Sequence, residues 1–109
     1  MSWTTELPFA ITVCDKDGNI LEMNDKSKKT FEKWGADLIG ASLFNCHPEP
    51  AKSKLTEMFK NPRINAYTIE KNGVKKLIYQ SPWFENNEFM GFVELSLEIP
   101  FEMPNYVRK

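Results

Sequence analysis

The chain has 109 residues, of which 41% are apolar and 27% are charged, and these are the proportions of one ordinary globular domain. Disordered, collagenous and coiled-coil chains are thereby excluded. Fourteen Lys and Arg residues against fifteen Asp and Glu residues give a net charge of -1, so no overall positive field exists to gather nucleic acid or an anionic membrane. The longest apolar stretches are less than half of the ~20 residues that cross a bilayer, and the first residues carry no positively charged leader. We therefore expect a cytoplasmic domain without nucleic-acid or membrane partners.

The chain opens with the pattern of a β-hairpin. Residues 9–14 alternate in the manner of a strand, and Asp17-Gly18-Asn19 turns the chain into a second apolar segment at residues 20–23. Two short antiparallel strands are predicted here.

Helices are predicted in the middle of the chain. Asn24 or Asp25 can accept the free N–H groups of a first helix, which Gly35 ends. Residues 36–49 are interrupted by glycine and proline but are too apolar for a free loop, so short helical turns packed on the core are expected. Residues 50–60 place apolar side chains on one helical face, and the Asn-Pro pair that follows ends this second clear helix.

The last third predicts three strands. Residues 67–69 alternate with period two, and Asn72-Gly73 is typical of a type I′ turn that leads into residues 74–84. Asn86-Asn87 makes another turn before the alternating residues 91–99. Two strands, short helices, one longer helix and three strands indicate an α+β domain, with an antiparallel sheet and its helices on one face. We expect a single domain over 1–109, with a core at about 8–99 and flanking segments at 1–7 and 100–109.

This order of elements resembles a PAS domain, the small sensory fold of many signalling proteins. The resemblance covers about nine-tenths of the chain and rests on several short motifs in the expected order. These are Cys14-Asp15 with Asp17-Gly18, Ile20-Leu21-Glu22-Met23-Asn24, Phe31 with Trp34-Gly35, Leu38-Ile39-Gly40 with Leu43-Phe44, Asn72-Gly73, and Met90-Gly91-Phe92-Val93. It implies a cupped five-stranded sheet of order 2-1-5-4-3, closed by the middle helices over a central pocket that holds haem, flavin, a metabolite or nothing.

The resemblance also implies a role in signal transduction through a small ligand or a protein partner. The 109 residues depart from the common pattern because they contain no expected kinase, cyclase or DNA-binding region, and because residues 100–109 stand where a long output helix often follows. We find no spaced carboxylate pair in an apolar setting and no phosphate-binding glycine loop, so we expect no enzymatic activity.

A set of pocket residues follows from the resemblance, with Ile78 and Gln80 assigned inward so that one amide lies in an otherwise apolar site. We expect Gly91 to mark a place where a ligand or a helix side chain approaches the strand backbone closely. The expected ligand-binding residues are Phe31, Trp34, Leu43, His47, Leu55, Phe59, Tyr67, Ile78, Gln80, Gly91 and Val93. The alternative is a constitutive homodimerisation module in which these residues form a filled core without a ligand.

His47 is the single histidine and precedes the longer helix in Cys46-His47-Pro48-Glu49-Pro50. A neutral imidazole can ligate haem iron, so His47 is the axial ligand if haem is bound; otherwise the segment is an ordinary helix start. Flavin is disfavoured because the residues after Asn45-Cys46 differ from those of light-sensing relatives. No spacing of Cys and His supports another metal site, and the cofactor stays unidentified.

The strand at residues 74–84 is apolar on both faces, so something must cover the second one. Leu77, Tyr79 and Trp83 share one face, while Val74, Ile78, Gln80 and Phe84 share the other. Soluble monomers seldom leave such a patch open. We expect Trp3 and Leu7 of the N-terminal segment, another subunit, or both to cover it. The expected homodimer interface includes Trp3, Leu7, Leu77, Tyr79 and Trp83.

Overall fold

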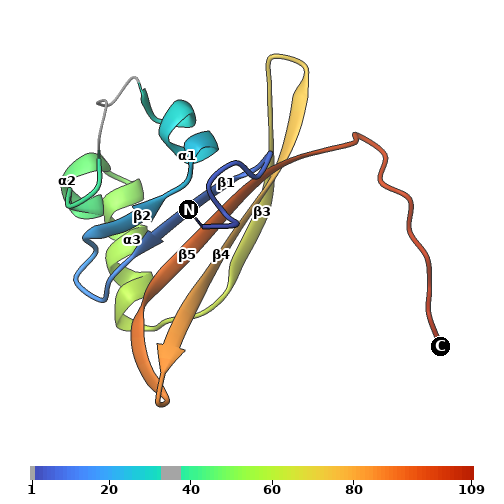
Figure 1. Ribbon diagram of the computed structural model, residues 1–109. Coiled ribbons are helices and arrows are strands. Elements are labelled where there is room, and N and C mark those ends of the chain that lie inside the picture. Colours follow the sequence, from blue (N-terminus) through green and yellow to red (C-terminus); the bar gives the residue numbers. More distant parts are fainter. Residues whose placement is uncertain (1, 33–37) are drawn as a thin grey trace.

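The structure is a computed structural model that describes residues 2–32 and 38–109. Its five strands form one antiparallel sheet of order β2-β1-β5-β4-β3 (Figure 1). The strands are β1 (Ala10–Cys14), β2 (Ile20–Met23), β3 (Asn65–Lys71), β4 (Val74–Glu85) and β5 (Glu88–Ile99). The α+β class that the sequence predicts and the strand order that the resemblance to PAS domains implies are confirmed.

Asparagine-containing turns set the register of the long strands. Asn72 and Gly73 have φ of 54° and 78°, and Asn86 and Asn87 have φ of 51° and 66°. Positive φ at both central residues defines the type I′ turn, whose twist matches that of the strands it joins. These two turns fold β3, β4 and β5 into a continuous meander.

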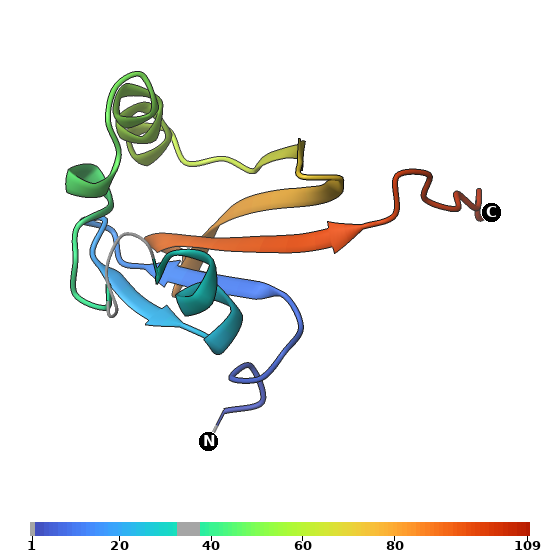
Figure 2. The same ribbon diagram turned by 90° about the horizontal axis from the view of Figure 1, so that it is seen from above.

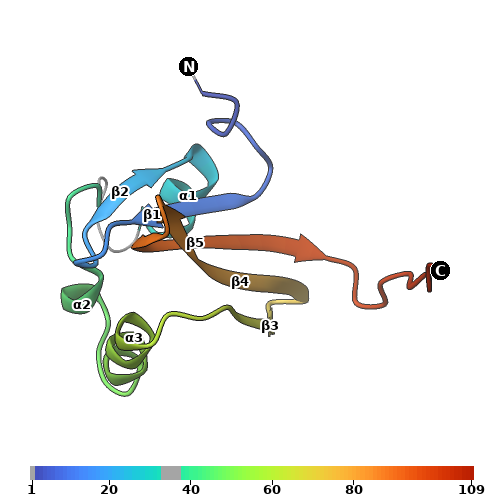
Figure 3. The same ribbon diagram turned by 90° about the horizontal axis from the view of Figure 1, so that it is seen from below.

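The three helices of the described residues are gathered on one side of the sheet (Figures 1 and 3). They are α1 (Asp25–Thr30), α2 (Leu43–Cys46) and α3 (Ala51–Lys60). Helix α1 packs on β1 and β2, whereas α2 packs on α3, and α3 stands apart from the strands (Figure 2). The last residues expected for the first helix, including Trp34, lie outside the described residues.

The buried Asn24 side chain joins three segments of the chain. Its Oδ1 accepts from the backbone N–H groups of Ile11 and Ser27, both at 3.0 Å. Its Nδ2 donates to the carbonyl oxygens of Thr4, at 3.0 Å, and Phe9, at 2.9 Å. All four hydrogen-bonding positions of the amide are therefore used. Asn24 caps α1, as expected, and also holds the N-terminal segment against β1.

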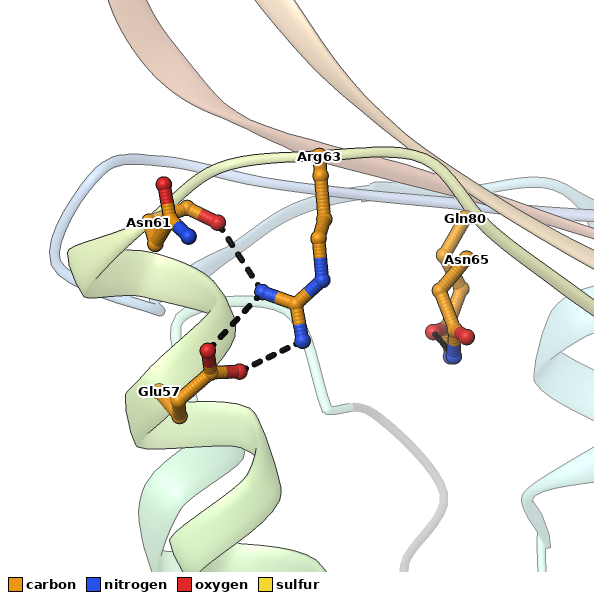
Figure 4. Close-up of polar contacts among 5 residues, drawn as sticks. All are labelled: Glu57, Asn61, Arg63, Asn65 and Gln80. Carbon is orange, nitrogen blue, oxygen red and sulfur yellow. Dashed lines mark hydrogen bonds and ion pairs between the residues drawn. The ribbon is translucent and has the colours of Figure 1, made fainter.

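Arg63 connects the segment between α3 and β3 to α3 by hydrogen bonds and an ion pair (Figure 4). Its guanidinium group donates to both carboxylate oxygens of Glu57 and to the carbonyl oxygen of Asn61. Both charged side chains are about half exposed, so this ion pair adds little stability but defines the path of the chain.

Aromatic rings fill the end of the domain where α3 faces β5. The Phe59 ring centroid lies 5.1 Å from that of Phe44, 5.0 Å from that of Phe92 and 6.0 Å from that of Phe89. Phe92 packs with buried Cys14 and Met58 in the same cluster. This cluster holds α3 against the sheet through the contact of Phe59 with Phe92.

Residues 100–109 lead away from the sheet after β5 ends (Figure 1). Tyr106 and Val107 are 73% and 86% exposed. No helix follows Ile99 in the described chain, in keeping with the departure from the long output helix that the sequence indicates.

Candidate ligand cavity

A cavity of about 390 Å³ lies between the sheet and the helices. This volume falls at the lower end of the range for small-molecule sites, which are mostly apolar with a few placed polar groups. The lining residues are Thr12, Cys14, Ile20, Met23, Phe31, Leu38, Leu43, His47, Pro48, Leu55, Met58, Phe59, Gln80, Phe92 and Glu94. We call the face of the sheet that carries Thr12, Gln80, Phe92 and Glu94 the inner face.

The polar part of the cavity wall is a row across neighbouring strands. Thr12 of β1 pairs with Glu94 of β5, Glu94 pairs with Gln80 of β4, and Gln80 pairs with Asn65 of β3. Asn65 Nδ2 donates to Gln80 Oε1 at 2.9 Å (Figure 4). Gln80 Nε2 in turn donates to Glu94 Oε2 at 2.7 Å. The antiparallel register therefore produces a directed chain of hydrogen bonds that ends on the Glu94 carboxylate.

The helical wall of the cavity is apolar except for His47. Leu55, Met58 and Phe59 follow the i, i+3, i+4 spacing that places side chains on one face of a helix. His47 Nδ1 lies 2.7 Å from the carbonyl oxygen of Leu43. Because a carbonyl only accepts, Nδ1 carries the proton, and in the neutral form of the ring Nε2 is the nitrogen that can accept or ligate.

Two groups near the cavity have raised pKa values, which favours their neutral forms further. Desolvation raises the pKa of the Cys14 thiol, even though its sulfur accepts from the Phe92 N–H. Desolvation and the negative charge of Glu94 raise the pKa of Tyr67. Cys14 thus behaves as a small apolar side chain, and Tyr67 is a neutral phenol.

Six expected pocket residues lie in the cavity wall: Phe31, Leu43, His47, Leu55, Phe59 and Gln80. Trp34 lies outside the described residues. The other four do not line the cavity. Tyr67 and Ile78 pair with each other and share the inner face with Gln80, but they lie two residues further along their strands.

Val93 was expected in the pocket and lies on the opposite face. It pairs with Val13 and Ser81, and its neighbours Phe92 and Glu94 line the cavity, so the alternation of a strand turns Val93 away. The more apolar set of side chains in β5 therefore points away from the helices.

Gly91 is required by the backbone of β1, and the expectation of a ligand or a helix side chain is wrong. A Cβ atom at Gly91, whose φ is +140°, would lie 2.0 Å from the carbonyl oxygen of Cys14. The indole Nε1 of Trp83, the pairing partner of Gly91, donates to the same oxygen at 3.0 Å. Since β5 lies between β4 and β1, the indole reaches across Gly91.

Several lining residues were missed, and Glu94 matters most. Period two in β5 places Phe92 and Glu94 on one face, and pairing of Glu94 with Gln80 would have brought them to the inward-assigned amide. The register that makes this pairing is not legible in either strand alone.

The opposite side of the sheet, which we call the outer face, is mostly apolar, with Lys75 and Ser81 as its polar side chains on β4. Its apolar side chains, identified by the strand register, include Ile11, Val13, Leu77, Tyr79, Val93, Leu95 and Leu97. Each is partly exposed. Trp3, expected to help cover this face, is 81% exposed, whereas Leu7 is half-buried.

A family model described as PAS fold matches residues 4–61, which is more than half of the chain. The chain belongs to the PAS family. PAS domains are sensory signalling modules that interact with ligands or partners. No curated protein matches the chain in sequence.

Three solved structures illustrate the likeness in fold. A C-terminal domain from Streptococcus mutans has a TM-score of 0.72 at 18% identity, covering 87% of this chain and 78% of that one. The PAS domain of the histidine kinase ThkA has a TM-score of 0.62 at 21% identity, with coverages of 81% and 96%. The Aer2 receptor from Vibrio cholerae, a dual PAS-heme oxygen sensor, has a TM-score of 0.59 at 16% identity, with coverages of 84% and 95%.

The described residues offer neither a membrane-spanning helix nor a cluster of metal ligands. In the described ranges, no helix has the length and apolar character needed to cross a membrane. Among the same residues, no group of three or more His, Cys, Asp or Glu side chains could hold a metal ion.

Proposed function

We propose that this PAS domain is a non-catalytic sensory module that binds a small organic ligand in the cavity and signals through the outer face of its sheet. The observation that carries the proposal is the cavity itself, which combines an apolar wall with a short row of polar groups. A constitutive dimerisation module with a filled core would not need this space. Burial raises the pKa of the Cys14 thiol, which makes it a poor nucleophile.

Signalling needs a connection between the two faces, and the strands provide it. Glu94 on the inner face lies between Val93 and Leu95 on the outer face, and Gln80 lies next to Tyr79. A ligand that shifts the inner side chains of β4 and β5 therefore also shifts the outer ones. Binding would select one arrangement of this surface over another.

The outer face is proposed as the homodimer interface. It is apolar across three neighbouring strands, and an isologous dimer covers the same patch on both subunits. Leu77 and Tyr79 lie within this face, while Trp83 lies at its β4 end. Two copies would cover each other's exposed apolar area without a further chain.

Native mass spectrometry with an absorption spectrum tests the ligand proposal. Freshly purified protein is expected to carry a bound small molecule in the cavity. Leu55→Trp fills the cavity from α3 and should lose that adduct, whereas Lys54→Trp, at an exposed neighbouring position, should keep it. Bare protein in every sample, with no uptake of added small molecules, would contradict ligand sensing.

Haem sensing is a second candidate because of His47. The Leu43 carbonyl oxygen fixes the imidazole tautomer and leaves Nε2 free at the cavity wall, which suits an axial ligand. Haem would supply gas binding at its iron. The charges fit less well, because no Lys or Arg in the described chain lines the cavity to pair with the propionates, and Glu94 carries the same sign.

Reconstitution with hemin decides between the two candidates. A sharp, shifted Soret band in the wild type that His47→Ala broadens to that of free hemin would support haem sensing. Identical spectra for the two proteins would exclude His47 ligation and leave the cavity to an organic ligand.

A further inference from the structure

The Glu94 carboxylate is the one acidic side chain in the wall of the cavity, as far as the described residues show. It is partly buried, and its hydrogen bond from Gln80 Nε2 occupies a single position on Oε2. A carboxylate offers about four acceptor positions. Most of the acceptor capacity of Glu94 is therefore left for a ligand.

The Gln80 amide is held in the orientation that points its Nε2 at Glu94. Asn65 Nδ2 donates to Gln80 Oε1, and a reversed amide would place two donors together on one side and two acceptors on the other. The Asn65–Gln80 pair therefore acts as a positioning device for Glu94. It presents the carboxylate in one orientation.

Among the described residues, no Lys or Arg side chain pairs with Glu94 inside the cavity. Neither Lys nor Arg appears among the lining side chains in the described ranges, and the other polar members of the wall are Thr12, His47 and Gln80. Thr12 is engaged with the Ser27 hydroxyl, and the His47 Nδ1–H group is engaged with the Leu43 carbonyl. Because a partly desolvated carboxylate is costly without an opposite charge, Glu94 favours a ligand that carries a positive charge.

The rest of the cavity specifies the body of that ligand. Leu55, Met58 and Phe59 face it from α3, and Phe92 lies beside Glu94 on the inner face. This wall can bury a hydrocarbon or aromatic group, which contributes roughly 25 cal/mol for each Å² removed from water.

We infer that the cavity takes a small apolar amine, whose ammonium group pairs with Glu94 while its hydrocarbon or aromatic body lies among the apolar side chains of α3 and β5. The inference rests on the proposed ligand-binding function and adds the class of ligand. An apolar carboxylate of the same length is disfavoured because it repels Glu94. A neutral alcohol is intermediate because it donates one uncharged hydrogen bond.

Three probes of equal length separate these possibilities: 4-phenylbutylamine, 4-phenylbutan-1-ol and 4-phenylbutyrate. Their dissociation constants are measured at pH 7 by titration of ¹⁵N-labelled protein, followed in amide NMR spectra. We expect the amine to bind at least about tenfold more tightly than the carboxylate, a difference of about 1.4 kcal/mol. Glu94→Gln, which keeps the size and can still accept from Gln80, should remove that preference and change the affinity for the alcohol less than that for the amine.

Glu98→Gln is the matched control because it removes the same charge from β5 outside the cavity wall. It should leave the order of the three probes intact. A carboxylate that binds as tightly as the amine, or an amine preference that survives Glu94→Gln, would overturn the amine inference while leaving ligand sensing in place. Failure of all three probes to bind, or binding that Leu55→Trp does not reduce, would contradict both proposals.

Discussion

The two faces of the sheet differ in their side chains and in what covers them. The inner face, which the helices cover, carries the polar row of Thr12, Glu94 and Gln80 beside the buried side chains of Cys14, Ile78 and Phe92. The outer face, which they leave uncovered, carries apolar side chains such as Tyr79 and Leu95. A few polar groups beside an apolar wall suit a ligand, and an uncovered apolar surface suits a partner, which is the division of roles that we propose for the two faces.

The largest expected effect comes from the point where β5 crosses closest to β1. Gly91→Ala would force a Cβ atom against the Cys14 carbonyl oxygen, so β1 and β5 must separate and both faces lose their alignment. We expect a loss of roughly 3 kcal/mol or more in the free energy of unfolding, measured by urea denaturation. Gly40→Ala is the control, because Gly40 also has positive φ but faces open space. Equal losses for the two variants would show that backbone strain alone explains Gly91.

Removal of the Asn24 side chain should have the next largest effect. Asn24→Ala leaves the donors of Ile11 and Ser27 and the acceptors of Thr4 and Phe9 without their partner. Because these groups lie at the buried junction of β1 and α1, we expect a loss of about 2–4 kcal/mol in urea denaturation. Asn45→Ala, at an exposed position, should change stability by less than about 0.5 kcal/mol. A similarly small change for Asn24→Ala would show that the Asn24 hydrogen bonds do not stabilise the junction of β1 and α1.

A charge on the outer face should separate subunits without unfolding them. Tyr79→Glu places a carboxylate in the middle of the apolar patch, where an aromatic anchor contributes ~2 kcal/mol or more to an interface. Analytical ultracentrifugation is expected to show wild-type dimers and Tyr79→Glu monomers with an unchanged circular dichroism spectrum. Lys71→Glu, at the exposed end of β3, should remain dimeric. Monomeric wild type at tens of micromolar would contradict the dimer.

The sequence determined the elements of the fold better than the roles of its two faces. The Asn72-Gly73 and Asn86-Asn87 turns, the Asn24 cap and the alternation of β5 were readable because each depends on neighbouring residues. Alternation says which side chains share a face but not which face the helices cover. The apolar set containing Val93 was therefore placed inward, and Glu94 was missed. The row that reaches Glu94 is made by pairing across strands, which no local pattern records.

The smallest expected effect compares thiols on the two faces. In a Cys46→Ser background, Cys14 is buried in the cavity wall with a raised pKa, so a smaller fraction is thiolate at pH 8 than for a free cysteine. We expect iodoacetamide to modify Cys14 several times more slowly than a thiol introduced by Thr68→Cys in a Cys14→Ser/Cys46→Ser background, since residue 68 is exposed. The 4-phenylbutylamine probe should slow the reaction at Cys14 only. Equal rates at the two positions would contradict the closed inner face.

The separation of the two faces is tested most directly by methyl NMR spectra of one ¹³C-labelled sample, recorded while 4-phenylbutylamine is added and again while the protein is diluted. Addition of the amine should first shift inner-face and helical methyl groups, those of Ile20, Leu43, Leu55 and Met58. Dilution through the dimer dissociation range should shift the outer-face methyl groups of Leu77, Val93, Leu95 and Leu97. Amine-induced shifts confined to the outer set, or an inner set that stays unmoved at saturation, would contradict the assignment of ligand to one face and partner to the other.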